Sequence, residues 1–169
     1  MLRSIVLALA SLILFLPAAF AQLETGPLTV TSGDTEHRFT VELANDPEEV
    51  QTGLMNREEL GPDAGMLFDF GQPREANMWM KNTLIPLDML FMDPNGKIIA
   101  IARETVPGSL RTISPGVPVK SVLELNGGRA AELGIELEGT APTVAPPEAD
   151  VPIPSPSGGT APTVAPPEA

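Results

Sequence analysis

The side chains best suited to bind a ligand or react with one are concentrated in the segment MWMKNTLIPLD, residues 78–88. On a strand, Trp79 and Lys81 would point to the same side, because successive side chains alternate between the two faces. With Asn82 and Asp88 they could form a polar cleft that has an aromatic wall. The alternative is structural: the tryptophan packs in the core, the lysine pairs with a carboxylate and Asp88 caps a turn.

Arg57 and Glu124 are the other charged candidates. Arg57 follows a predicted helix and could hold the carboxylate of a ligand, or pair with Asp88 or Glu124. A favourable contact with the helix dipole would also explain it. Glu124 is expected on the solvent side of its strand or at the mouth of a pocket. As a pair, Asp88 and Glu124 could supply the acid and base of an envelope sugar or peptide hydrolase.

Methionine offers a different kind of site. Cysteine is absent, so thioethers are the soft ligands that remain for Cu(I). Met78 and Met80 would lie on one face of a strand and could bind that ion together. The same residues stand among leucine, isoleucine and phenylalanine, where methionine usually fills gaps in a core. A methionine copper site is therefore an alternative to core packing.

Motifs for catalysis and cofactor binding are otherwise missing. The sequence contains no nucleophile elbow, phosphate-binding loop, dinucleotide fingerprint or zinc-protease motif. The absence of cysteine excludes disulfides, iron–sulfur clusters and a thiol nucleophile, and the single histidine, His37, excludes a site that needs two imidazoles. We therefore expect a protein that has no cofactor and that binds a ligand rather than turning one over.

The elements that position these residues form a domain over residues 22–138. Apolar runs separated by turn residues predict strands, and Asp46 followed by Pro47 predicts the start of a helix. The pattern indicates an α+β, β-rich domain: a mainly antiparallel curved sheet or a partly open barrel with two short helices. The expected elements are strands at 27–33, 37–44, 65–70, 75–83 and 119–128, a hairpin at 86–103, and helices at 46–59 and 129–135.

Both ends of the chain lie outside this domain. Residues 1–21 combine a basic residue, an apolar run and an Ala-Phe-Ala cleavage site, which is the pattern of a secretory signal peptide. The apolar run is shorter than the roughly 20 residues of a membrane span. We therefore expect a periplasmic or secreted protein that keeps no stable membrane span after cleavage. Residues 139–169 are rich in proline and contain GTAPTVAPPEA twice, which predicts a disordered tail.

The charge balance restricts the partners. The chain has 22 acidic and 10 basic residues, which gives a net charge of −12. Such a charge opposes binding to nucleic acid and to anionic membrane surfaces. The partners that remain are a small polar ligand or a protein of the cell envelope.

Four segments of the domain closely resemble a known family: GLMNREEL (53–60), GMLFDF (65–70), MWMKNTLIPLDMLFMDPNGKIIAI (78–101) and KSVLELNGG (120–128). In order and spacing they are similar to domain-of-unknown-function family 192, DUF192, over nearly all of residues 26–138. The resemblance implies a compact β-rich fold with helical inserts, and it implies no established activity. The polar positions that match the family motif are Arg57, Lys81, Asn82, Asp88 and Glu124.

The sequence thus predicts an exported binding or accessory module of the cell envelope without catalytic turnover. Its cleft would be formed by Trp79, Lys81, Asn82 and Asp88, with Arg57 nearby. The envelope hydrolase and the copper-binding protein are the two alternatives.

Overall fold

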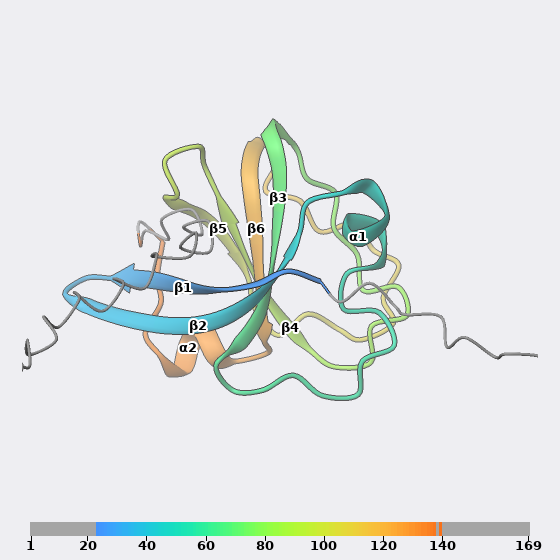
Figure 1. Cartoon of the computed structure of the whole chain (residues 1–169), viewed down its shortest axis with the longest axis horizontal. Helices are drawn as coiled ribbons and strands as arrows, with labels where there is room; N and C mark the ends of the chain where they lie inside the picture. Colours follow the sequence, from blue (N-terminus) through green and yellow to red (C-terminus); the bar gives the residue numbers. More distant parts are fainter. Residues whose placement is uncertain (1–22, 138, 140–169) are drawn as a thin grey trace, which may run out of the picture.

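The computed structural model describes residues 23–137 and 139 (Figure 1). Within them, six strands form one sheet in the order β1-β2-β3-β6-β4-β5. The elements are β1 (Thr25–Ser32), β2 (Thr35–Ala44), α1 (Pro47–Thr52), β3 (Ala64–Glu75), β4 (Leu87–Met92), β5 (Ile98–Ala102), β6 (Pro118–Asn126) and α2 (Arg129–Glu132). The predicted signal peptide lies outside the described residues, as does the predicted tail apart from Gly139.

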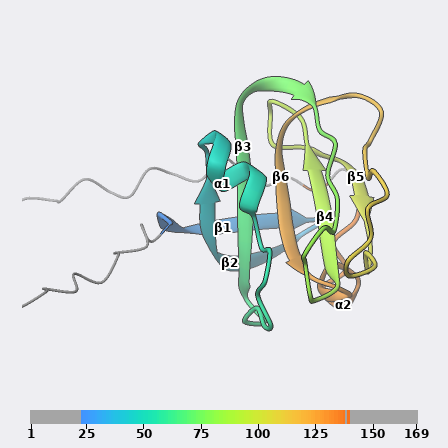
Figure 2. The same cartoon turned by 90° about the vertical axis from the view of Figure 1, so that its right-hand side faces the viewer.

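The sheet is mixed and curved. β2 and β3 are parallel, whereas the other four pairs of neighbouring strands are antiparallel. The β1–β2 hairpin curls across strands β3, β6, β4 and β5, which stand side by side in Figure 2. β1 and β5 form the two edges, so the sheet does not close into a barrel. The predicted β-rich α+β class with a mainly antiparallel curved sheet is confirmed.

Turn chemistry fixes the hairpin of β4 and β5. The carboxylate oxygen Oδ1 of Asp93 accepts hydrogen bonds from the backbone amides of Asn95 (2.8 Å) and Lys97 (2.9 Å). Gly96 completes the turn with a φ of 77°, a conformation that glycine adopts without steric cost. The predicted hairpin at 86–103 is confirmed.

α1 begins as predicted. The carboxylate of Asp46 accepts hydrogen bonds from the amides of Glu48 (2.8 Å) and Glu49 (2.9 Å), which have no partner within the helix. The carboxylate of Glu49 accepts in return from the amide of Asp46 (3.2 Å). This reciprocal pair closes a capping box at the helix start.

Both helices are shorter than the predicted ones at 46–59 and 129–135. α1 stops because Gly53 adopts a φ of 48° and turns the chain toward the sheet, where a Cβ at this position would lie 3.0 Å from the ring of Phe68. α2 has a single turn, and Gly134 with a φ of 66° prevents its continuation. No helix in the described part of the chain is long and apolar enough to cross a membrane.

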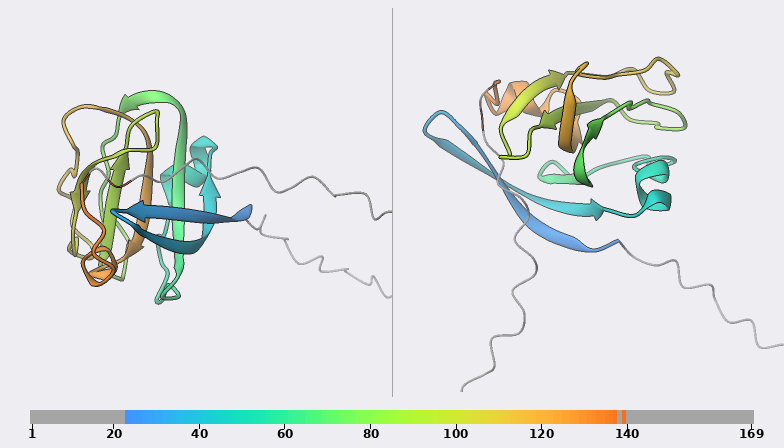
Figure 3. Two further views of the ribbon diagram at one scale, coloured as in Figure 1. Left: turned by 90° about the vertical axis from the view of Figure 1, so that its left-hand side faces the viewer. Right: turned by 90° about the horizontal axis from the view of Figure 1, so that it is seen from above.

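Two apolar clusters cover the two faces of the sheet. Adjacent strand residues belong to different clusters, as Leu90 and Phe91 do, because side chains alternate along a strand. The cluster that contains Leu90 includes residues of the β1–β2 hairpin and of α2. The cluster that contains Phe91 lies on the side of α1 and of the loops after β3. Figure 3 shows α1 and α2 on opposite sides of the central strands.

The segment at 75–83, predicted to be a strand, is a turn-rich loop after its first residue. Of the described residues in this loop, Met78 alone pairs as in a sheet, through an isolated bridge to Ile113. The chain turns because Asn82 has a φ of 56° and because the backbone amide of Thr83 donates a hydrogen bond to the carbonyl oxygen of Met80 (3.1 Å). The side chains of this loop therefore do not alternate between two faces.

Candidate functional site

A pocket of about 80 Å³ opens on the side of the sheet that carries α1. Its walls come from α1 and the turn after it, from β3 and from the loop that follows β3, and its base includes Glu124 of β6. In another protein an engineered cavity of about 150 Å³ holds benzene. The pocket therefore has room for one small chemical group, and the rest of any ligand would lie across its rim.

Glu124 is buried at this pocket, with 4% of its surface exposed. Its cross-strand neighbours Met66 and Met89 belong to the apolar cluster on the same face of the sheet. No group in the described part of the chain forms a hydrogen bond or ion pair with its carboxylate. The sequence left two positions open for Glu124, the solvent side of its strand or a pocket. The structure places it at the pocket, so the prediction of a solvent-facing side chain is wrong.

Burial raises the pKa of Glu124 to about 8, because the charged form loses its hydration and gains no partner. At neutral pH the carboxyl therefore keeps its proton. A protonated carboxyl has one hydrogen to donate and a carbonyl oxygen that accepts. It can bind a neutral acceptor, or transfer its proton to a basic group of a ligand.

A glycine allows β3 to approach β6 closely at the backbone of Glu124. A Cβ at Gly65 would lie 2.7 Å from the carbonyl oxygen of Glu124 and 2.9 Å from the side chain of Leu125. The leucine side chain could rotate away, but the contact with the carbonyl oxygen is impossible without movement of the backbone. Gly65 therefore sets the position of Glu124 within the sheet.

Phe68 and Phe70 of β3 form an aromatic wall that the sequence analysis missed. They are two residues apart, so they share one face of the strand. The GMLFDF pattern contains this signal, but on its own it does not separate a pocket wall from an ordinary core face. Met55 and Met78 complete the apolar lining near them.

Trp79 and Lys81 lie together at the rim. Trp79 lines the pocket although 45% of its surface is exposed. The Nζ atom of Lys81 lies 5.2 Å from the centroid of the indole ring, within the range of a cation–π contact. The two residues are thus neighbours, as expected, but the turn in the loop brings them together and not the alternation of a strand.

Arg74 is a second cation at the rim and was not identified from the sequence. Its guanidinium carbon lies 4.1 Å from the centroid of the Phe70 ring. The same two residues also line a shallower hollow of about 300 Å³ that extends toward the start of α1 at Asp46. No pattern in the sequence marks this position, because GQPRE is typical of a loop, whereas in the structure it is the exposed end of β3.

Asn82 lies beside the pocket and does not line it. Its side-chain amide is 3.9 Å from the sulfur of Met55, within reach of a weak hydrogen bond. Its main structural contribution is its backbone, whose positive φ produces the turn of the loop. Asn82 is therefore a residue that positions the rim.

Arg57 binds Glu42 of β2 and not the two carboxylates suggested by the sequence. The guanidinium and carboxylate form a two-point ion pair, in which the Nη2–Oε2 distance is 2.6 Å. This hydrogen-bonded contact raises the pKa of Arg57. Because its donors are engaged there, the alternative in which Arg57 pairs with Asp88 or Glu124 is wrong.

Asp88 is fully buried and acts as an acceptor for backbone amides. Its Oδ1 accepts from the amides of Glu104 (2.7 Å) and Gly128 (3.0 Å), and its Oδ2 accepts from Ala130 (2.8 Å). Asp88 therefore ties the start of α2 to the loop after β5. Asp88 therefore has the structural role of a cap, as the alternative reading of the sequence predicted. The amides that it caps belong to the start of α2 and the loop after β5, and not to the turn next to Asp88.

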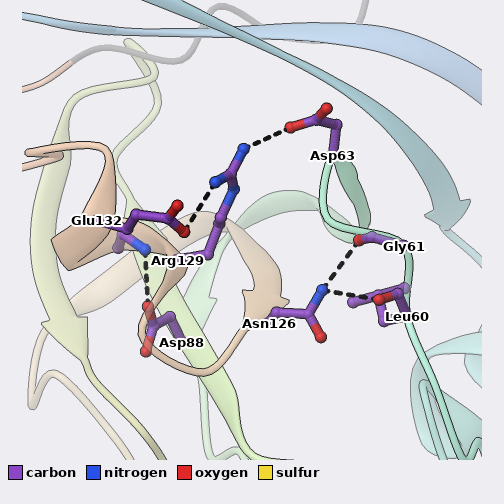
Figure 4. Close-up of polar contacts among 8 residues, drawn as sticks. Leu60, Gly61, Asp63, Asp88, Asn126, Arg129 and Glu132 are labelled. Carbon is purple, nitrogen blue, oxygen red and sulfur yellow. Dashed lines mark hydrogen bonds and ion pairs between the residues drawn. The ribbon is translucent and has the colours of Figure 1, made fainter.

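Further polar contacts surround Asp88 (Figure 4). The Arg129 guanidinium bridges Asp63 (2.6 Å) and Glu132 (2.8 Å). The side-chain amide of Asn126 donates to the carbonyl oxygens of Leu60 and Gly61, each over 2.9 Å. These bonds hold α2 and the end of β6 against the loop before β3, so the cluster is a brace.

The pair of Asp88 and Glu124 is not brought together. Asp88 stands opposite Leu125 in the β4–β6 pairing, whereas Glu124 stands opposite Met89. Residues that face each other across two strands share a face, and sequence neighbours do not. The two carboxyl groups therefore project from opposite faces of the sheet, and they cannot act as acid and base on one substrate.

Met78 and Met80 do not share a strand face either. Met80 is fully buried, and its sulfur accepts a hydrogen bond from the hydroxyl of Thr105 (3.1 Å), whereas Met78 lines the pocket. Core packing is therefore the role of Met80. Within residues 23–137 and 139 there is also no group of three or more His, Asp or Glu side chains placed to hold a metal ion.

Comparison with known proteins identifies relatives. The family model DUF192, described as an uncharacterised ACR, matches residues 28–140. One relative with a solved structure is a protein from Sinorhizobium meliloti 1021, described provisionally as a transcription regulator. It is 42% identical to this chain. The match covers 71% of this chain and 94% of that one, with a TM-score of 0.70. A protein of unknown function from Novosphingobium aromaticivorans DSM 12444 is 39% identical over 73% of this chain and 88% of that one, also with a TM-score of 0.70. No curated protein gives a significant match.

Proposed function

The chain belongs to the DUF192 family, for which no activity is described, and from its own pocket we propose a function. We propose that it is an exported, non-catalytic binding module. It holds a small polar ligand between the carboxyl of Glu124 and the indole of Trp79. Lys81 and Arg74 stand at the rim of the same site. The residues of the predicted cleft thus contribute unequally, and Asp88 is not part of it.

The observation that carries this proposal is the unpartnered carboxyl of Glu124. Buried polar groups are nearly always hydrogen-bonded, because a buried group without a partner costs about 1–3 kcal/mol. Glu124 has no protein partner in the described part of the chain, and its side chain faces a pocket. A ligand that presents a carbonyl, ether or hydroxyl oxygen would supply the missing contact.

The rim favours a ligand with a flat apolar surface or an anionic group. The exposed indole of Trp79 offers a face for stacking, and two cations flank the opening. The pocket takes only one small group of about 80 Å³. A short peptide or a sugar that inserts one substituent fits these features.

Binding is favoured over catalysis because, among the described residues, Glu124 is the single acidic side chain that lines the pocket. General acid–base hydrolysis needs a second group that acts on the same substrate. The description of the Sinorhizobium relative names transcription regulation for that protein. Direct binding to nucleic acid is disfavoured here by the net charge of −12, which opposes contact with phosphates. The signal-peptide pattern at 1–21 supports a periplasmic or secreted location.

The test is a ligand screen on the protein that begins at Gln22. Muropeptides, oligosaccharides, amino acids and Cu(I) are added singly, and both the thermal melt and the fluorescence of Trp79 are recorded. A ligand at a hundred times its dissociation constant adds about 2.7 kcal/mol to the folded state. A compound that shifts the wild type should shift Glu124→Leu much less, and it should shift the surface control Glu36→Gln equally. Equal shifts in all three proteins would refute the site.

A further inference from the structure

Exposed apolar side chains are concentrated in two loops next to the pocket. Among the described residues, five of the six large hydrophobic side chains that are exposed lie in the segments 78–85 and 105–117. Four of them form what we call the loop patch: Trp79, Leu84, Val106 and Leu110, which are 45%, 54%, 68% and 71% exposed. Single apolar residues on a surface are ordinary, whereas several that gather in neighbouring loops are typical of an interaction site.

Backbone hydrogen bonds hold the two segments side by side. Met78 and Ile113 exchange two of them, each 2.9 Å long, and the amide of Met80 donates to the carbonyl oxygen of Ser109 (3.0 Å). The amide of Gly108 donates to Thr83 (3.1 Å). Both loops therefore lie at the same end of the molecule, on the α1 side of the sheet (Figure 1; Figure 3). The patch is a fixed surface because its backbone is bonded across the two loops.

The local charge of these segments is opposite to that of the chain. They contain two basic residues, Lys81 and Arg111, and no acidic residue, although the whole chain has 22. Acidic residues lie just outside the two segments: Glu75 and Glu104, which are exposed, precede them along the chain. Glu58 and Glu59 follow the turn that contacts Asn82. At physiological salt, electrostatic interactions are screened over a distance of about 8 Å. A surface in contact with the loops is therefore attracted mainly by the cations of the loops and is repelled less by the distant acidic residues.

We propose that the loop patch docks this protein onto an anionic lipid bilayer. The four apolar side chains enter the interfacial layer, where the amphipathic ring of tryptophan is favoured, and Lys81 and Arg111 face the headgroup phosphates. The acidic remainder of the domain is repelled, which fixes the orientation with the pocket rim toward the lipid. This contact is peripheral, and it goes beyond the binding role because it does not require an occupied pocket.

This proposal departs in one respect from the expectation that the acidic charge opposes anionic membrane surfaces. The net charge of −12 averages over the whole chain. Docking depends on the charge and the apolar area at the contact, which here come from two short loops. The whole-chain charge still limits the strength of binding, so we expect reversible docking that weakens as salt is added.

The chain contains a single tryptophan, and it lies in the patch, so its fluorescence reports docking directly. The protein that begins at Gln22 is mixed with vesicles of phosphatidylcholine alone, or with equal parts of phosphatidylglycerol. We expect co-sedimentation and a blue shift of Trp79 emission only with the anionic vesicles. Lys81→Gln combined with Arg111→Gln should lower the partition coefficient about thirtyfold.

Matched variants separate the patch from general effects. Leu110→Ser should weaken binding, whereas Leu137→Ser, at another exposed leucine outside the loops (55% exposed), should not. Arg38→Gln is the control for charge. Glu124→Gln should leave vesicle binding unchanged, so failure of the ligand site and failure of this proposal can be told apart. Circular dichroism melts establish that each variant is folded.

Three results would overturn the proposal. The first is the absence of both sedimentation and blue shift at low salt. The second is vesicle binding that Leu110→Ser and the double charge variant leave intact. The third is a dimer, seen by sedimentation velocity, that Leu110→Ser dissociates, since the patch would then be an interface between copies of the chain.

Discussion

The backbone amide of Asn56 donates a hydrogen bond of 2.8 Å to the carbonyl oxygen of Asn82, and both residues have positive φ angles, 61° and 56°. This bond fastens the turn after α1 to the loop that carries Trp79 and Lys81. Asparagine tolerates the left-handed conformation better than other residues that have a side chain. The rim of the pocket thus depends on two asparagines that meet through their backbones.

Replacement of Asn82 should therefore act through backbone strain. Asn82→Ala is expected to lower the free energy of unfolding by about 1–2 kcal/mol, the cost of a left-handed residue, whereas Asn82→Gly should change it little. Asn77→Ala, on the same loop without a positive φ, is the control. Urea unfolding measures all three. Equal destabilisation by alanine and glycine would point to the side-chain contact with Met55 instead.

The stability of the protein should depend on pH through Glu124. Its carboxyl releases its proton near pH 4.5 in the unfolded chain and near 8 in the folded protein. Between these values the folded state binds more protons, so the free energy of unfolding falls as pH rises, by up to about 1.4 kcal/mol per pH unit. Above the folded pKa this contribution levels off.

Urea unfolding of the wild type and of Glu124→Gln, from about pH 5 to about pH 9, isolates this group. The glutamine cannot ionise. The free energy of unfolding of the wild type should therefore fall, relative to that of Glu124→Gln, as the pH rises. A difference that is constant over this range would mean that Glu124 is hydrated or paired in the folded protein.

Asp88→Asn should destabilise the fold strongly. An asparagine amide in this position offers one oxygen in place of two, and its NH₂ group would face a backbone donor. We expect a loss of about 2–4 kcal/mol, because charge-assisted bonds to buried amides are lost. The exposed partner of Arg129 serves as control, since Asp63→Asn should cost under about 1 kcal/mol. If both variants lost the same amount, Asp88 would not be the brace that its contacts indicate.

Gly65→Ala should disturb the site without touching a ligand-contacting side chain. The added methyl group would overlap the carbonyl of Glu124, so β3 and β6 must separate. Overpacking of this kind costs about 1–3 kcal/mol. Gly71→Ala, at a positive φ but in open space, should cost only about 1 kcal/mol. Thermal melts compare the two, and a smaller effect at 65 than at 71 would contradict the tight approach.

The exported protein should begin at Gln22. The Ala-Phe-Ala pattern at 19–21 predicts cleavage after Ala21. N-terminal sequencing of the protein recovered from the periplasm or medium checks this prediction. Recovery of an intact Met1 from the cytoplasm would refute both the cleavage and the export.

The sequence predicted the elements that local chemistry determines. The helix start at Asp46, the turn at Asp93 and the alternation of apolar residues are encoded over a few residues, and the structure contains them as expected. The loop at 75–83 was mistaken for a strand because its apolar residues imitate alternation. Its shape depends on a positive φ at Asn82 and on bonds to a loop about thirty residues later, neither of which periodicity reveals.

The candidate site was predictable in part for the same reason. Trp79, Lys81 and Glu124 were identified by residue type, and the fold brings the first and last of them to one pocket. Asp88 has the same chemistry as Glu124, yet it braces α2 on the other face. Which face a strand residue occupies depends on the pairing register of β4 and β6, and a single sequence does not contain that information.

The register of the central strands also has a consequence for the order of folding. Met66 of β3 pairs with Glu124 of β6, so the base of the pocket joins residues that are far apart along the chain. Closing so long a loop costs entropy before any contact compensates for it, whereas the β1–β2 and β4–β5 hairpins close locally. A chain that emerges from its N-terminus can form the first hairpin early, but it cannot complete the pocket until β6 has emerged. The pocket is then among the last parts of the protein to form.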